Sequence, residues 1–127
     1  MLGGDIVRYD PKTAKLERLK QTIDGKPPTK ESNLANPGNG HPINWDVTPD
    51  GKTLYAVAMA TNQLFSYDLT QTGPTLAGRS LGELVPGAKG VDCRAMCVGP
   101  KGTFAGFVPM GARSEAEAVA CVLLRHG

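Results

Sequence analysis

The sequence lacks the features by which membrane and exported proteins are recognised. None of its 127 residues belongs to an apolar run that approaches the ~18 residues of a membrane-spanning helix. The first residues have neither the basic segment nor the apolar core of a signal peptide. We therefore predict no membrane span in this chain, and the sequence leaves the cellular location undetermined.

The sequence also lacks an excess of charge of one sign. It has 14 Lys and Arg residues against 12 Asp and Glu residues, a formal net charge of +2. The basic residues between Lys12 and Lys30 are interleaved with acidic ones. A nucleic-acid-binding surface gathers its basic residues on one face or along one helix. We therefore predict no nucleic-acid partner.

Cysteine and histidine are scarce, and their spacing predicts no structural zinc site. Cys93, Cys97 and Cys121 form no C-x-x-C pair, and no H-x-x-x-H pair exists. On one strand Cys93 and Cys97 would stand about 13 Å apart, too far for a disulfide. We expect buried, reduced thiols. Paired catalytic carboxylates, a nucleophile elbow and a phosphate-binding glycine loop are also absent.

What the sequence does contain is a repeated strand–turn–strand unit. Residues 43–57 are typical of two apolar strands joined by an Asp50-Gly51 turn, and residues 91–107 repeat this pattern around Gly102. An Asp-Gly pair tolerates the positive φ of a tight hairpin. A second echo relates residues 6–10 to residues 64–68, since each ends in Tyr-Asp. Repeats of about 40–50 residues built from short strands are typical of β-propeller blades.

The pattern along the chain predicts the following strands: 5–10, 15–19, 43–48, 53–60, 63–68, 75–84, 91–98 and 103–108. Residues 21–42 are rich in Gly, Pro and Asn and predict a long loop, of which 24–40 should be disordered. Trp45 is expected in the core. Residues 114–117 fit a helix-capping box, but the alternation after them fits a strand, and both alternatives stay open.

The expected fold class is all-β: an incomplete β-propeller over residues 1–110, with four-stranded antiparallel blades, followed by an atypical tail over 111–127. A ring of roughly 4–8 blades needs more residues than this chain has. We therefore expect a fragment of a six- or seven-bladed ring. Unpaired blade faces and strand edges should make such a fragment self-associate.

Three segments carry a resemblance to a known group. Residues 48–57, residues 64–69 and the stretch from Gly4 to Thr13 resemble the blades of NHL, YVTN and streptogramin-lyase-like propellers. Members of that group include lyases, lactonases, metal-dependent hydrolases and binding scaffolds. The resemblance implies a binding or scaffold module whose partner is a small molecule or a protein on the propeller face. The alternative is a metal-assisted lyase or hydrolase, and only this alternative requires a cofactor, a divalent cation.

Propeller sites usually lie at the entries of the inner strands and in the loop between the second and third strands of a blade. The residues expected at those positions are His41, Asn44, Asn62, Asp92 and Arg94. His41 would be a metal ligand or an acid–base group, Asp92 a ligand or orienting group, and Arg94 an anion contact. Structural alternatives stay open, because His41 fits a solvated loop and the Asp92–Arg94 pair fits a link between blades. Asp46 fits either the site or a bond to the backbone of its own turn.

Overall fold

The chain consists of strands and turns wherever the structure describes it. The computed structural model describes residues 6–30, 32–34, 43–58, 61–89, 95–99, 103–110 and 118–125. Within these ranges there are nine strands and no α-helix. The strands are β1 (Ile6–Asp10), β2 (Lys15–Ile23), β3 (Ile43–Val47), β4 (Thr53–Ala58), β5 (Gln63–Asp68), β6 (Thr75–Glu83), β7 (Ala95–Val98), β8 (Thr103–Met110) and β9 (Ala118–Arg125). The prediction of an all-β chain is confirmed.

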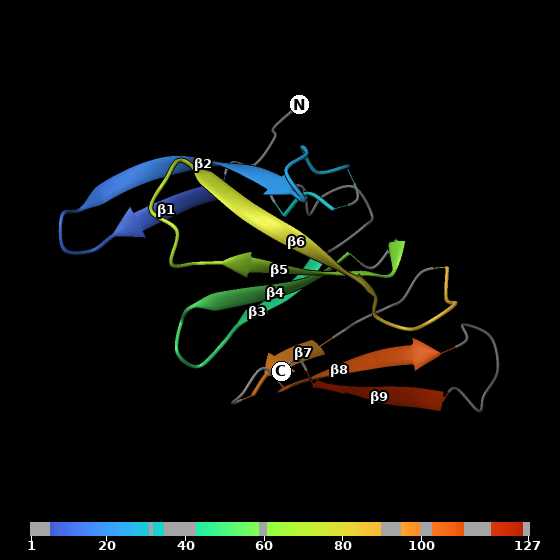
Figure 1. Ribbon diagram of the computed structural model, residues 1–127. Helices are drawn as coiled ribbons and strands as arrows, with labels where there is room; N and C mark the ends of the chain where they lie inside the picture. The colour runs from blue at the N-terminus through green and yellow to red at the C-terminus, as the bar shows by residue number, and fades with distance from the viewer. Residues whose placement is uncertain are drawn as a thin grey trace.

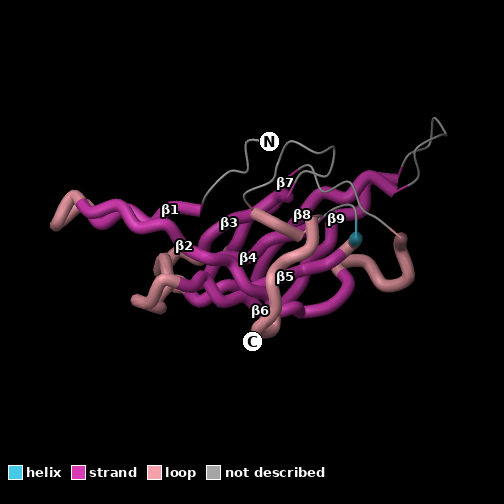
Figure 2. Tube along the Cα trace, turned by 90° about the horizontal axis from the view of Figure 1, so that it is seen from above, coloured by secondary structure: helices cyan, strands magenta, loops and turns pink. Residues whose placement is uncertain are grey.

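Six of these strands form one curled sheet, which has the shape of a half-barrel (Figure 1). The strand order is β1-β2-β6-β5-β4-β3. The remaining strands form a second sheet of order β7-β8-β9, and β7 lies against β3. Seen from above, the tip of the β1–β2 hairpin extends away from the other strands (Figure 2).

The larger sheet is mixed. Strands β3, β4, β5 and β6 follow one another as an antiparallel meander. Strand β2 then pairs with β6 in parallel, Lys20 opposite Thr75 and Ile23 opposite Gly78. The sequence predicts separate antiparallel units and a loop from residue 21 onward. The β1–β2 hairpin instead joins the meander, because the free edge of β6 pairs with β2 as far as Ile23.

Aspartate side chains close the hairpin turns. Between β3 and β4, Gly51 has a φ of +72° and Oδ1 of Asp50 accepts hydrogen bonds from Lys52 N and Thr48 Oγ1. Asp10 and Asp68 accept equivalent bonds from the residues that follow them. Such bonds favour the ionised carboxylate and lower its pKa. The predicted Asp-Gly hairpin is therefore confirmed, with its physical basis visible.

The central strands are buried on both faces. Alternate residues of β4 point to opposite sides: Ala56 and Ala58 join one core cluster, and Tyr55 and Val57 join the other. The first cluster lies on the concave side of the sheet and continues through Phe65, Tyr67 and Leu76. The second faces β7 and includes Leu64, Leu84 and Val98. Burial on both faces explains why β4 is an unbroken apolar run.

The smaller sheet bears on two expectations: whether a helix or a strand follows residue 117, and whether the cysteines are buried. Residues 118–125 form β9, paired antiparallel with β8, so the strand alternative is the one found there. Cys97 is exposed, against the expectation of a buried thiol. The reason is the alternation of β7, which turns Val98 and Met96 toward the core and Cys97 away from it. The side chains of Cys93 and Cys121 lie outside the description.

Gly78 of β6 is expected to be essential for packing. It lies opposite Tyr67, and a Cβ at this position would meet the Tyr67 ring, with Cδ1 only 2.8 Å away. We expect Gly78→Ala to lower the free energy of unfolding by about 1–3 kcal/mol, because overpacking forces side chains off their rotamers. Urea unfolding at fixed protein concentration measures this. Gly73→Ala is the control, since a Cβ there has nothing within 4 Å; equal midpoints for the two variants would contradict the prediction.

Candidate functional site

Two of the five expected site residues lie in the part of the chain that the structure describes. His41, Asp92 and Arg94 lie outside the described residues, so the roles expected of them stay predictions. Asn44 is half-buried in β3, and Asn62 is buried in the β4–β5 connection. The register places the start of β3 beside the end of β4. Both asparagines therefore lie at the same end of the sheet.

The side chain of Asn62 is engaged within the protein. Its Nδ2 donates to the carbonyl oxygens of Val85 and Ala88 at 2.6 and 3.0 Å, and its Oδ1 accepts from Val85 N at 2.9 Å. Its backbone has a φ of +53°, a conformation that asparagine tolerates better than most residues. Asn62 thus fastens the connection that follows β6 to the β4–β5 turn. A ligand contact of this amide would have to compete with those bonds.

Asp46 joins the two sheets. Its Oδ1 accepts a hydrogen bond from Val47 N at 2.8 Å, and its Oδ2 accepts one from Val98 N in β7, also at 2.8 Å. A carboxylate in this position accepts hydrogen bonds from backbone N–H groups that have no partner in the strand pairing. Asp46 was expected either in the site or bonded to the backbone of its own turn. Its contacts are bonds to the backbone, and one of them reaches beyond its own strand to β7.

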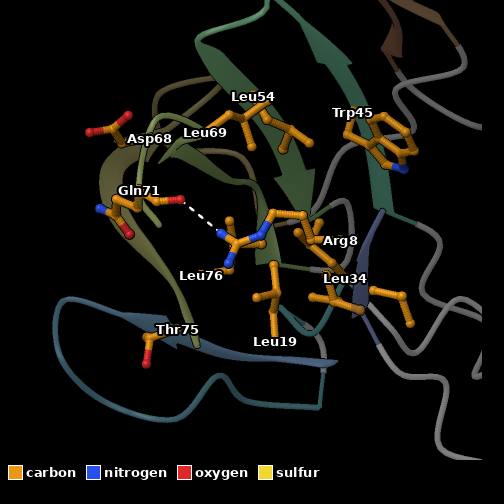
Figure 3. A pocket seen from close by; sticks show the side chains of 12 residues that line it. Arg8, Leu19, Leu34, Trp45, Leu54, Asp68, Leu69, Gln71, Thr75 and Leu76 are labelled. Carbon is orange, nitrogen blue, oxygen red and sulfur yellow. Dashed lines mark hydrogen bonds between the residues drawn. The ribbon is translucent and has the colours of Figure 1, made fainter. Parts of the chain in front are cut away.

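A hollow in the described part of the chain lies on the concave side of the half-barrel (Figure 3). It has a volume of about 460 Å³. Apolar side chains from five strands line it: Ile6, Leu19, Trp45, Leu54 and Leu76. Ligand pockets typically measure about 300–1,000 Å³ and are mainly apolar. The cavity therefore has the size and lining of a small-molecule site.

Trp45 lies at one side of this cavity and is 56% exposed, against the expectation of a core residue. It occupies the end strand of the curled sheet, and its cross-strand neighbour is the small Ala56. A strand at the end of a sheet has a partner on one side only, so a large side chain there keeps much of its surface open. The exposed indole gives the cavity an aromatic wall.

Arg8 ties the hairpin to the loop between β5 and β6 across the cavity. Its Nη1 donates to Gln71 O at 2.8 Å, and its Nη2 donates to Thr72 O and Gly73 O at 2.9 and 3.2 Å. Nη2 also contacts the Glu17 carboxylate at 2.7 Å. The hydrogen bonds that Arg8 donates to the Glu17 carboxylate lower the pKa of Glu17.

A buried polar network holds the segment that follows β2. Nε2 of Gln21 donates to the Tyr67 hydroxyl at 2.7 Å and to Ser32 O at 3.1 Å. Its Oε1 accepts from Leu34 N at 3.1 Å, which places Leu34 in the cavity wall. The expectation of disorder over 24–40 is therefore wrong for its described residues up to 34. Gln21 bonds to Ser32 and Leu34, and Thr29 bonds to Ser32, so these residues are held in place.

The described residues contain no group of three or more His, Cys, Asp or Glu side chains that could hold an ion. In the same ranges, no helix is long and apolar enough to cross a membrane.

The cavity was not predicted from the sequence, although the alternation of β2 pointed toward it. Leu19, Gln21 and Ile23 continue the alternation of β2 past the expected end of the strand at residue 19. A longer strand would have indicated another sheet partner, but the identity of that partner, β6, cannot be read from spacing.

Replacing Arg8 should loosen the contact between the hairpin and the β5–β6 loop. We expect Arg8→Met to lower the free energy of unfolding by about 1–2 kcal/mol, since charged hydrogen bonds to carbonyl groups are lost and part of the site is open to solvent. Arg79→Met is the control, because Arg79 is an exposed arginine of β6. Denaturant midpoints that differ from wild type equally in both variants would count against the assigned role of Arg8.

Tyr67 should make stability depend on pH in the alkaline range. Burial raises the pKa of its hydroxyl from 10.0 to about 12, because the charged phenolate loses hydration. The folded state then holds its proton more tightly than the unfolded chain. The raised pKa therefore adds up to about 2–3 kcal/mol to the free energy of unfolding below pH 10. This stabilisation is lost as the pH rises from 10 to 12. Urea unfolding of wild type and Tyr67→Phe across this range tests it, and parallel pH curves would refute it.

Comparison of the chain with protein-family models, with curated proteins and with solved structures found no match.

Proposed function

We propose that this chain is a β-propeller-like binding module that holds a small apolar molecule in the cavity of its half-barrel. The observation that carries the proposal is the cavity of about 460 Å³ itself. Its apolar walls come from strands far apart in the sequence, and an exposed tryptophan borders it. A water-filled apolar hollow is costly, and an apolar ligand removes that cost.

Two further features support the propeller part of the proposal. The meander β3–β6 has the strand order of a propeller blade, and the Asp-Gly turn at Gly51 has the positive φ that the repeat requires. The sequence resemblance to NHL, YVTN and streptogramin-lyase-like blades points the same way. The parallel pairing of β2 with β6 is a departure from a regular blade. The proposal of a binding module does not depend on how many blades the ring has.

The lyase or hydrolase alternative rests on residues that the structure does not describe, His41 above all. The binding proposal rests instead on described residues, those that line the cavity.

Binding can be followed through the protein's own fluorescence. Trp45 is the only tryptophan of the chain, so its emission reports on this cavity alone. We expect the uncharged dye N-phenyl-1-naphthylamine to quench Trp45 by energy transfer and to brighten on leaving water. Leu19→Phe should weaken the apparent affinity at least tenfold, because the larger ring fills the space.

The matched control is Leu16→Phe. Leu16 is the same residue type in the same strand, but it is 68% exposed and does not line the cavity. This variant should bind the dye as wild type does. Equal affinities for wild type and Leu19→Phe, with both proteins folded, would place the dye elsewhere and count against the proposed function.

A further inference from the structure

We infer that the cavity selects an uncharged ligand with a planar ring and rejects carboxylates and ammonium ions built on the same ring. This inference rests on the proposed function and specifies its ligand class. It follows from the contacts that the charged and aromatic side chains of the cavity wall already make.

Arg8 is the only cationic side chain among the described residues that line the cavity, and its charge is already compensated. The Glu17 carboxylate lies 2.7 Å from Nη2, and three carbonyl oxygens of residues 71–73 accept from Nη1 and Nη2. In Figure 3 the guanidinium is directed toward Gln71 and bonded to its carbonyl. A ligand carboxylate would have to displace these partners and would meet the negative charge of Glu17. Arg8 therefore gives an anion little net attraction.

Asp68 is the only anionic side chain among the same lining residues, and it is engaged at the rim. Its Oδ1 accepts bonds from Thr70 N at 2.9 Å and Thr70 Oγ1 at 2.6 Å. The side chain is exposed, and Figure 3 shows its carboxylate directed away from the other labelled side chains. An ammonium ion inside the cavity would lose its hydration without reaching this carboxylate. Cations therefore lack an anionic partner inside the cavity among the described wall residues.

The indole of Trp45 supplies the positive part of the recognition. It is the only aromatic side chain among the described lining residues, and it is more than half exposed. Leu54 lies two residues from Ala56, the cross-strand neighbour of Trp45, and so on the same face of the sheet. A planar ring can stack on the indole face and contact this aliphatic side chain at the same time. Stacked aromatic pairs gain stability beyond the burial of their area.

Three probes with one ring system separate these effects: indole, indole-3-acetate and tryptamine, which are uncharged, anionic and cationic at neutral pH. Trp45 gives the only indole N–H cross-peak in a ¹⁵N–¹H correlation spectrum of the labelled chain. We expect indole to shift this peak in a saturable manner. The two charged analogues should bind at least tenfold more weakly.

Removing the carboxylate beside Arg8 should increase the affinity of the cavity for an anionic ligand. In Glu17→Gln the charge of Arg8 loses its neighbouring carboxylate, so indole-3-acetate should bind several-fold more tightly while indole is unchanged. Glu83→Gln is the control, because it removes the same charge from an exposed residue that does not line the cavity. An equal gain in both variants would indicate a general charge effect and overturn the inference.

The outcomes separate the inference from the proposed function. If indole-3-acetate or tryptamine binds as tightly as indole, the selectivity is wrong, and the cavity remains a binding site. If the uncharged dye binds in a manner sensitive to Leu19→Phe but indole does not bind, recognition of a planar ring is wrong. If neither the dye nor any of the three probes perturbs Trp45, the proposed function itself is overturned.

Discussion

The parallel pairing between β2 and β6 is the constraint on which the rest of the structure depends. It is a short contact, from Lys20 opposite Thr75 to Ile23 opposite Gly78. It nevertheless attaches a local hairpin to a local meander and makes one curled sheet from the two. The cavity exists because the hairpin is held over the concave face of the meander. Without this pairing, Ile6 and Leu19 would have no wall opposite them.

The side-chain interactions that reinforce this pairing are polar. Gln21 bonds to Tyr67 below the hairpin, and Arg8 bonds to the β5–β6 loop beside it. Buried hydrogen bonds add little net stability, but they are costly to leave unmade, so they select one arrangement among several. Gly78 contributes in a different way, since the absence of a side chain makes room for the Tyr67 ring. Hydrogen bonding and close packing thus act on the same tyrosine.

The proposed binding function follows from what the curled sheet leaves open. The face toward β7 is filled by a core cluster, whereas the concave face is closed only in part. The charged groups at its border are engaged with one another or with the backbone, and the exposed aromatic surface is not covered by any described residue. A site of this kind recognises shape and apolar surface, and it offers a ligand few polar contacts. This is the physical basis of the proposed selectivity for uncharged rings.

Local features were predictable because they depend on neighbouring residues. The apolar strands β4 and β5, the Asp-Gly turn before Lys52 and the Asx turn at Asp10 follow from short-range patterns that the backbone cannot easily satisfy in another way. Three residues of the candidate site, His41, Asp92 and Arg94, lie outside the described residues, so the site stays a prediction. The sequence pointed to asparagines near strand entries, and the contacts found for Asn62 are with the backbone of the β6–β7 connection.

The sequence by itself determined that the chain is all-β and where its central hairpin turns. Only the tertiary structure decided that β2 runs to Ile23, that Trp45 is exposed, and that a cavity lies between the hairpin and the meander. The physical reason is range. Strand formation and turns are set by residues a few positions apart, whereas the free edge of β6 accepts whichever strand reaches it, and spacing along the chain carries no record of that choice.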